Sequence, residues 1–384
     1  MTEKLFDNGT LFAFDAQVTA CAETEKGYEV ILDRTAFFPE GGGQAGDAGT
    51  LDGVKVTDTY ERNGEVIHLC RSSLEVGKKV YGEIDADIRI RRMQNHSGEH
   101  LLMGFIHNMT GYENVGFHMG SEEVLLDLDG VISADDIRIC EQKSNEAVAA
   151  DVPITISYPD GEELSCMEYR SKLEMTENVR IVTIEGIDRC ACCAPHFPST
   201  GSIGIIKVIS AESNRGGTRL HIICGLDALD LIRQRMESNA AISRMLSAKP
   251  EKTADAVEKL LGENAALKKQ LAENERRAAE DIIGSIKNDS RKSFCVFTRG
   301  IGRNNMQKIA NHAVKLTDGA VAVLSEDAAG FGYITASEKL PLRAMAKDIN
   351  LALGGKGGGS DQMIQGTFTA PKEAIESYFK AMQM

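Results

Sequence analysis

The 384-residue sequence contains no tryptophan, and aromatic residues make up only 5% of it. A folded core must therefore be built from aliphatic residues and methionine, and the hydrophobic content of 42% is sufficient for that. No apolar run approaches the roughly 20 residues of a membrane-spanning helix, so no membrane partner is expected. The length suits about two to four domains.

The chain also lacks an excess of basic residues. Its net charge is -14, which excludes coating of nucleic acid through bulk charge but leaves local basic patches open. The nine cysteines are odd in number and mostly stand singly in apolar stretches, a pattern typical of a reducing compartment. Because the N-terminal segment shows no signal-peptide pattern either, a cytoplasmic location is expected.

Hydrophobic patterning predicts an α+β protein of several domains. Residues 1–90 carry short β-type runs separated by turn signals, which predicts a small β-barrel. Residues 91–226 mix helical and strand patterns and predict an α+β domain. Residues 227–288 predict a long helical hairpin, which is favoured over a dimeric coiled coil because Asn264 and Asn274 interrupt the heptad. Residues 289–384 alternate strands and helices, which predicts a small α/β domain.

The first candidate site is the sequence HSGEH, from His96 to His100. As H-x-x-E-H it matches the inverted zincin signature of metallopeptidases, with Glu99 as the base. As H-x-x-x-H it is two histidines on one face of a helix, which can share a metal ion with ligands from elsewhere. A histidine pair without any ligand role is the third interpretation.

A second pair of metal-ligand type stands in the sequence CCAPH, where Cys192 precedes His196 by four residues. A thiolate and an imidazole on one turn can bind zinc, and mixed nitrogen and sulfur ligands suit its tetrahedral geometry. Cys190 and Cys193 are alternative thiols, but Cys192 is preferred for its spacing to the histidine. One zinc ion per chain is predicted, with the ligands His96, His100, Cys192 and His196.

Two glycine-rich stretches are candidate binding elements. Three consecutive glycines between Thr35 and Gln44 allow a positive φ and a close approach of the backbone to a ligand; a tight turn in the barrel is the simpler alternative. The stretch GGKGGGSDQMIQG, Gly354–Gly366, lacks the spacing of a P-loop. Its N–H groups and Lys356 could form a nest for a phosphate, or the stretch could be a flexible turn after a helix.

Together, these motifs resemble the editing modules of alanyl-tRNA synthetases in their free-standing AlaX form. TAFFPEGGGQAGDAG is similar to the glycine-rich stretch of that family, and NHSGEH and CCAPH are similar to its two zinc pairs, although CCAPH replaces the usual Cys-Gly-Gly-Thr-His. The helical region and GGKGGGSDQMIQG resemble the synthetase C-terminal region with its DHH-associated domain. Since the predicted barrel follows Met1 directly, the resemblance is to the long AlaX type, without an ATP site.

The resemblance implies that the protein hydrolyses the ester of mischarged tRNA(Ala), carrying serine or glycine, with Zn2+ as cofactor. Glu99 and His118 are the catalytic candidates, but the general base stays open, as does whether zinc is catalytic or positions the substrate. The helical and C-terminal regions are candidates for homodimer contacts. The substrate-binding candidates are Thr35, Gly41, Gly42, Gly43 and Gln44. The tRNA-binding candidates are Gly355, Lys356, Gly357, Gly358 and Gly359.

Two alternatives stand beside the editing hydrolase. One is a zinc metallopeptidase of the H-x-x-E-H type, in which Glu99 would activate water. The other is a tRNA-binding module in which four protein ligands close a structural zinc site.

Overall fold

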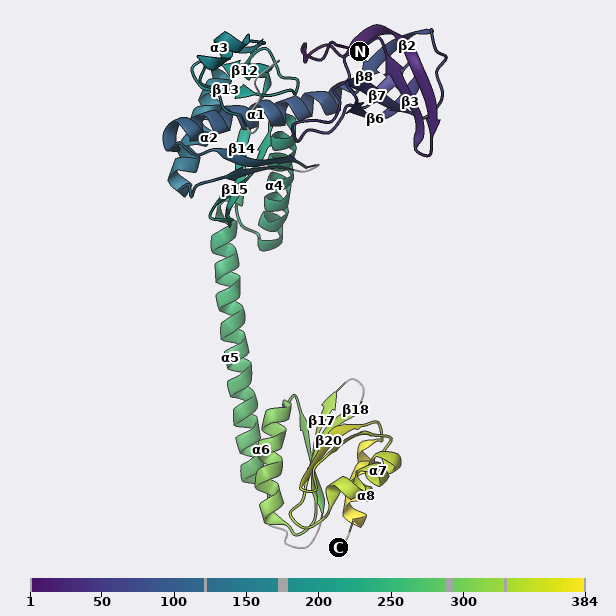
Figure 1. Ribbon diagram of the computed structural model, residues 1–384. Helices are drawn as coiled ribbons and strands as arrows, with labels where there is room; N and C mark the ends of the chain where they lie inside the picture. The colour runs from purple at the N-terminus through teal and green to yellow at the C-terminus, as the bar shows by residue number, and fades with distance from the viewer. Residues whose placement is uncertain (1, 121–122, 172–178, 288–292, 328–329, 383–384) are drawn as a thin grey trace. The chain divides into compact units, whose positions relative to one another are not determined.

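The computed structural model describes residues 2–120, 123–171, 179–287, 293–327 and 330–382. The chain forms two compact units, Met1–Ala240 and Ala241–Met384, and the elements of both are drawn in Figure 1. The predicted α+β class is confirmed, whereas the finer division into four domains stays a prediction. No helix in the described ranges has the length and apolar character that crossing a membrane requires.

The first unit contains the predicted β-barrel, which closes in the strand order β2-β3-β7-β6-β5-β8. Side chains alternate between its interior and its surface, as in β8, where Val80 and Ile84 are buried between exposed neighbours. Strand β5 was not predicted because three residues carry too little periodicity. The strands are β2 (Ala13–Thr24), β3 (Gly27–Leu32), β5 (Gly49–Leu51), β6 (Val54–Arg62), β7 (Glu65–Cys70) and β8 (Lys79–Ile84).

Helix α1, Ala86–Thr110, follows the barrel and carries the HSGEH sequence. Its N-cap Asp85 accepts a hydrogen bond from the backbone of Ile88, and it ends at Gly111, whose φ of 74° is left-handed. It shares one buried apolar core with α2 (Ala134–Ala149) and a four-stranded sheet. The sheet has the order β14-β15-β10-β9. Its strands are β9 (Asn114–Met119), β10 (Val124–Leu128), β14 (Ile206–Asn214) and β15 (Gly217–Cys224).

A smaller three-stranded sheet leads into the second candidate sequence. Its strands pair antiparallel in the order β11-β12-β13. Strand β13 ends at Ala191, so that Cys192 begins the turn that follows. The three strands are β11 (Ile154–Ser157), β12 (Ile181–Ile184) and β13 (Asp188–Ala191).

A buried ion pair joins α1 to the barrel. Arg89 and Asp47 are 0% and 1% exposed, and Arg89 Nε lies 2.9 Å from Asp47 Oδ2. The guanidinium also donates to the carbonyl oxygens of Ala36 and Gly9, and the carboxylate accepts from the backbone of Phe38. Both charges therefore have several partners, as buried charges require.

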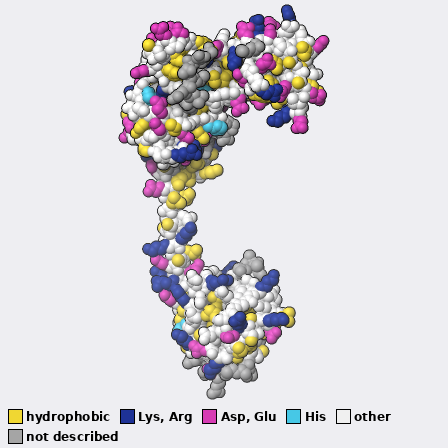
Figure 2. Space-filling model, viewed as in Figure 1, with side chains coloured by type: hydrophobic (Ala, Val, Ile, Leu, Met, Phe, Trp, Pro, Cys, Tyr) yellow, Lys and Arg dark blue, Asp and Glu magenta, His cyan; other side chains and the backbone are white. Residues whose placement is uncertain are grey.

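Two long helices follow, as predicted: α4 (Gly225–Leu246) and α5 (Thr253–Ser285). Their pairing as a hairpin stays a prediction. The last part of α5 packs against α6 (Arg303–Ala313) through Ala279 and its neighbours. The apolar side chains Val257, Leu260, Leu261, Leu267 and Leu271 of α5 are between 40% and 66% exposed. Lys and Arg side chains alternate with Asp and Glu side chains along the lower part of this helix in Figure 2.

The second unit ends in a five-stranded mixed sheet of order β16-β17-β18-β20-β19. One apolar cluster joins it to α5 and α6, and another joins it to α7 (Leu342–Ala352) and α8 (Lys372–Ala381). Helices thus cover both faces, as expected for the predicted α/β domain. The strands are β16 (Phe294–Arg299), β17 (Val321–Asp327), β18 (Gly330–Ala336), β19 (Lys356–Gly359) and β20 (Met363–Phe368).

The interpretation of the second glycine-rich stretch as a flexible turn was wrong, whereas its role in binding tRNA stays a prediction. Residues Lys356–Gly359 form the edge strand β19, antiparallel to β20, with all four residues exposed. A Cβ on Gly357 would lie 2.5 Å from Tyr333 Oη and 2.2 Å from the carbonyl oxygen of Gln365. Close packing, and not flexibility, therefore requires glycine there.

The buried ion pair makes a testable prediction about stability. Asp47→Asn should lower the free energy of unfolding of the first unit by about 3–5 kcal/mol, because it leaves the Arg89 charge buried without its counter-ion. Glu61→Gln is the control, since Glu61 pairs with Lys4 on the surface and should change stability by about 0–1 kcal/mol. Urea denaturation followed by circular dichroism measures both. Equal, small effects would contradict the prediction.

Candidate metal centre

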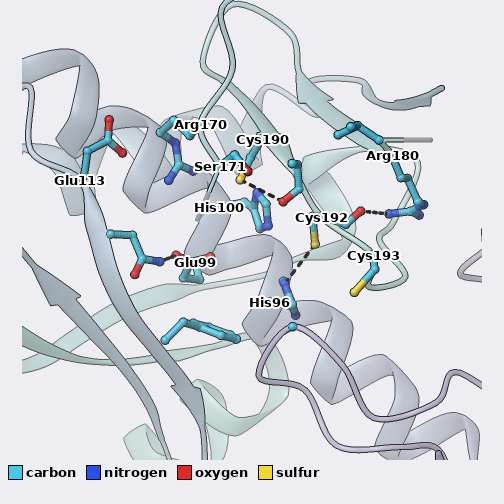
Figure 3. Close-up of a pocket in the computed structure, with 15 residues that line it drawn as sticks. His96, Glu99, His100, Glu113, Arg170, Ser171, Arg180, Cys190, Cys192 and Cys193 are labelled. Atoms are coloured by element: carbon cyan, nitrogen blue, oxygen red, sulfur yellow. Dashed lines mark hydrogen bonds between the residues drawn. The ribbon is translucent and has the colours of Figure 1, made fainter. Parts of the chain in front are cut away.

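The structure brings the four predicted ligands together. Helix α1 presents His96 and His100, and the turn after β13 presents Cys192 and His196. Figure 3 shows His96, His100 and Cys192 among the residues that line the neighbouring cavity. Their ligand atoms all lie within 4.8 Å of one another. The Cys192 sulfur is 3.4 Å from Nε2 of His96 and 3.4 Å from Nε2 of His196. The cluster could hold a metal ion, and the preference for Cys192 over its neighbouring thiols agrees with this placement.

Each imidazole of the cluster is oriented by a hydrogen bond at its Nδ1 atom. With Nδ1 engaged in this way, a neutral ring turns the Nε2 lone pair towards the centre of the cluster, which is the arrangement that metal-binding histidines use. The residues therefore fit a bound cation. The pairs are His96 with Gln44 Oε1 (3.0 Å), His100 with Asp188 Oδ2 (3.2 Å) and His196 with Ser97 Oγ (2.9 Å).

The sulfur of Cys192 is the anionic centre of the cluster. Burial alone would raise the pKa of its thiol, but His96, His196 and His100 together hold that pKa well below its usual value. Burial lowers the pKa of His196 to about 3, despite the adjacent sulfur, so this imidazole is neutral near pH 7. A thiolate and a neutral imidazole are the forms that bind a metal ion.

His100 carries the compensating positive charge. Burial alone would lower its pKa, but the Cys192 sulfur and the Asp188 carboxylate hold that pKa well above its usual value. Burial raises the pKa of Cys190 to about 11, so that thiol is neutral near pH 7. The two anions beside His100 are therefore the Cys192 thiolate and the Asp188 carboxylate, which a bidentate Arg170 also holds.

The cluster lies in the wall of a cavity of about 340 Å³. Glu99 reaches the same cavity, where its Oε1 accepts a hydrogen bond of 2.7 Å from Asn114 Nδ2. A carboxylate that is only 4% exposed therefore stands beside the candidate ligands. The lining includes Gly42, His96, Glu99, His100, Asn114, Phe117, Arg170, Arg180, Cys190, Cys192 and Cys193.

The three consecutive glycines form a tight turn whose tip lines this cavity. Gly41 and Gln44 exchange two backbone hydrogen bonds of 3.0 Å, and Gly42 and Gly43 have φ values of 58° and 83°, as in a type I′ turn. A Cβ on Gly43 would lie 2.5 Å from the ring of Phe117. The simple-turn and ligand-facing interpretations are therefore compatible.

Two predicted site residues lie away from the cavity. Thr35 is 0% exposed inside the barrel, with its Oγ1 2.8 Å from Nε2 of His68. His118 is exposed on β9; since side chains alternate along a strand, it points away from the face on which Phe117 lines the cavity. Residues 355–359 belong to the second unit.

Sequence reasoning missed the residues that orient the ligands. Ser97 adjoins His96, and Asp188 stands four positions before Cys192. Polar residues so close to predicted ligands could have been proposed as their hydrogen-bond partners, because ligand histidines almost always have one. Arg170, which holds Asp188 through Nε at 2.7 Å and Nη2 at 2.9 Å, gave no such signal.

The barrel and the region that carries the His/Cys cluster are both similar to parts of tRNA synthetases. A family model described as class II (A) tRNA synthetases matches residues 7–88. A second, described as the second additional domain of threonyl and alanyl tRNA synthetases, matches residues 179–220. Both matches lie within the first unit.

Relatives that match over nearly the whole chain show a more specific similarity than the two family models do. The chain is 27% identical to alanyl-tRNA editing protein AlaX-L of Pyrococcus horikoshii, with 94% of this chain and 93% of that protein covered. It is 26% identical to alanyl-tRNA editing protein Aarsd1 of Danio rerio, with 92% and 90% covered. It is 28% identical to alanine--tRNA ligase of Pyrococcus abyssi, but covers only 41% of that protein. The resemblance to free-standing AlaX-type editing proteins of the long form is confirmed.

The charges of the cluster predict how metal binding depends on pH. Because Cys192 is already a thiolate and His100 is protonated, binding near pH 7 should release about one proton, from His100. The apparent affinity should rise with pH and level off above the raised pKa of His100. Calorimetric titration in two buffers with different heats of ionisation counts the proton. Asp188→Asn should reduce the number released, and no release by the wild type would contradict the account.

Proposed function

We propose that the protein is a free-standing deacylase that hydrolyses the ester of mischarged tRNA(Ala), releasing serine and, as the second candidate, glycine. Two relatives named alanyl-tRNA editing proteins, similar over nine-tenths of this chain, support the reaction class. The observation that carries the proposal is the cluster of His96, His100, Cys192 and His196, of which the first three line a cavity. A metal ion held there would face a bound ligand.

The proposed cofactor is Zn2+, because three imidazoles and one thiolate suit tetrahedral zinc. When bound, the ion supplies Lewis acidity for polarising or positioning the reacting ester. The chain keeps the ligands in place: Gln44, Ser97 and Asp188 bind the three Nδ1 atoms and so fix each ring. Gln44 is therefore assigned to orienting His96 and not to the substrate.

Glu99 is the proposed general base. Its carboxylate lines the cavity, and the hydrogen bond from Asn114 fixes its orientation. In this role it accepts the proton of the water that attacks the ester carbonyl, and general-base catalysis of this kind contributes typically about 10²–10⁴-fold. His118 is not assigned a role, because it is exposed on β9, pointing away from the cavity.

The substrate would lie between the glycine turn and the cluster. Gly42 and Cys193 both line the cavity, and a glycine tip lets a ligand approach the backbone closely. Selection for the serine hydroxyl is not assigned to Thr35, which is buried against His68. For the tRNA body, the exposed strand β19 with Lys356 is the proposed contact, in a chain whose net charge of -14 otherwise repels RNA.

The alternatives differ from this proposal in the ligand set and in access to the ion. An inverted zincin takes a further carboxylate ligand, whereas the cluster here is completed by Cys192 and His196. A purely structural zinc is closed off by its ligands, whereas three of these four residues line the cavity. Both observations favour the deacylase.

Replacement of each thiol tests the ligand set. Cys192→Ala should reduce the zinc content from one ion per chain to near zero and abolish deacylation, because it removes the only thiolate of the cluster. Cys190→Ala and Cys193→Ala are matched controls that should retain zinc. Elemental analysis of the purified proteins measures the metal. Full activity in a wild-type protein without zinc would contradict the proposal.

A substitution at Glu99 distinguishes the proposed deacylase from the metallopeptidase alternative. Glu99→Gln preserves the shape of the side chain and its hydrogen bond with Asn114, but removes the basic oxygen. Zinc content should be unchanged, and the rate constant for hydrolysis of seryl-tRNA(Ala) should fall by about 10²–10⁴-fold. The same preparations should cleave no peptide. Specific peptide cleavage that disappears with Glu99→Gln would instead establish the metallopeptidase.

A further inference from the structure

Arg180 is hydrogen-bonded to the turn that carries two of the candidate ligands, Cys192 and His196. Its Nη1 donates to the carbonyl oxygen of Cys192 at 2.7 Å and to that of Ala194 at 2.9 Å. Its own carbonyl oxygen accepts from the backbone N–H of Cys192 at 3.1 Å. One buried residue thus fixes the backbone on both sides of the Cys192 sulfur, and Figure 3 shows the contact with the turn.

The guanidinium is anchored on its other side by Asp7. Arg180 Nε donates to Asp7 Oδ1 at 2.7 Å, and Asp7 Oδ2 accepts from Tyr158 Oη at 2.6 Å. Because the guanidinium is planar, a carboxylate on one edge sets the direction of the donors on the other edge. The acid that orients Arg180 therefore comes from the segment before the barrel, residues 2–9.

That N-terminal segment touches the same turn at two further points. Phe6, Phe38 and Ala194 form a small buried apolar cluster, in which the two phenyl rings meet edge to face at 5.5 Å. Gly9 lies so close that a Cβ there would be 2.3 Å from the carbonyl oxygen of His196. The second half of the segment, from Phe6 to Gly9, is thus packed against the Cys192–His196 turn.

We propose that Arg180, oriented by Asp7, is a positioning residue that sets the geometry of the Cys192–His196 turn and so the affinity of the metal site. The proposal rests on the cluster binding a metal ion and not on the reaction that follows. Arg180 holds two carbonyl groups in the direction that brings the Cys192 sulfur and His196 Nε2 to within 3.4 Å of each other. Lysine keeps the charge but cannot reach Asp7 and both carbonyl groups at once.

The test measures binding of Co2+ to the full-length, metal-free protein in competition with a chelator. The visible absorption bands of bound Co2+ are the second readout, since they report ligand geometry. Arg180→Lys should weaken Co2+ binding by about 10–100-fold and shift these bands, as expected when a residue that supports the ligands is lost. Asp7→Asn should change both readouts in the same direction. Rates of deacylation are not needed for the decision.

Arg219→Lys is the matched control. Arg219 also makes a bidentate pair, with Asp127, at 2.6 and 2.8 Å, but it lies on strand β15 outside the cavity lining. Its Co2+ affinity and spectrum should equal those of the wild type. Unchanged affinity and spectrum in a folded Arg180→Lys protein would overturn the proposal.

Asp7→Asn keeps the test decisive if Arg180→Lys does not fold. Co2+ binding and a spectrum identical to those of the wild type in this variant would also overturn the proposal, because the anchor would then have no effect on the site. If the wild-type protein binds no Co2+, both the role proposed for Arg180 and the assignment of the cluster as a metal site would be overturned. A wild-type protein that binds Co2+ but releases no amino acid would contradict only the proposed reaction.

Discussion

The candidate site depends on three hydrogen bonds at imidazole Nδ1 atoms. They orient His96, His100 and His196 so that all three Nε2 atoms meet the Cys192 sulfur within 4.8 Å. The hydrogen-bond partners come from three parts of the chain: Gln44 from the glycine turn, Ser97 from α1 and Asp188 from β13. The orientation of His96 therefore depends on contact between the glycine turn and α1.

The glycine turn explains how the barrel affects the orientation of a candidate ligand in α1. Gly42 and Gly43 adopt positive φ values, which brings Gln44 back to His96 and leaves the turn tip in the cavity wall. The buried pair of Arg89 and Asp47 then holds α1 against the barrel. The N-terminal part of the chain thus contributes one ligand-orienting side chain, one part of the cavity wall and the segment that contacts Arg180.

Sequence reasoning succeeded where short-range spacing decides geometry. Histidines four apart on a helix must share a face, and the Cys192–His196 spacing brought both side chains to one point. The predictions failed for residues on strands, where the direction of the side chain decides whether it reaches the cavity. Thr35 turned into the barrel and His118 away from the cavity, because side chains alternate along a strand and the register cannot be read from the motif.

The glycine-rich composition around Lys356 led to a wrong prediction of local structure for a different reason. This composition favours a flexible turn or a phosphate nest, whereas Gly357 and Gly359 of β19 pack closely against β20. The contact between Gly357 and Tyr333 joins residues that are distant in the sequence. A single sequence does not allow such a contact to be predicted. Arg170 and Arg180 could not be predicted for the same reason, since their partners lie on distant elements.

The most direct test of the account is the release of free serine from seryl-tRNA(Ala) by the wild-type protein, with and without a chelator. The account predicts release that exceeds spontaneous hydrolysis, that is lost after chelation and that returns when Zn2+ is added back. Correctly charged alanyl-tRNA(Ala), measured in parallel, should be spared. Release that is unaffected by removal of the metal, or no release at all, would contradict it.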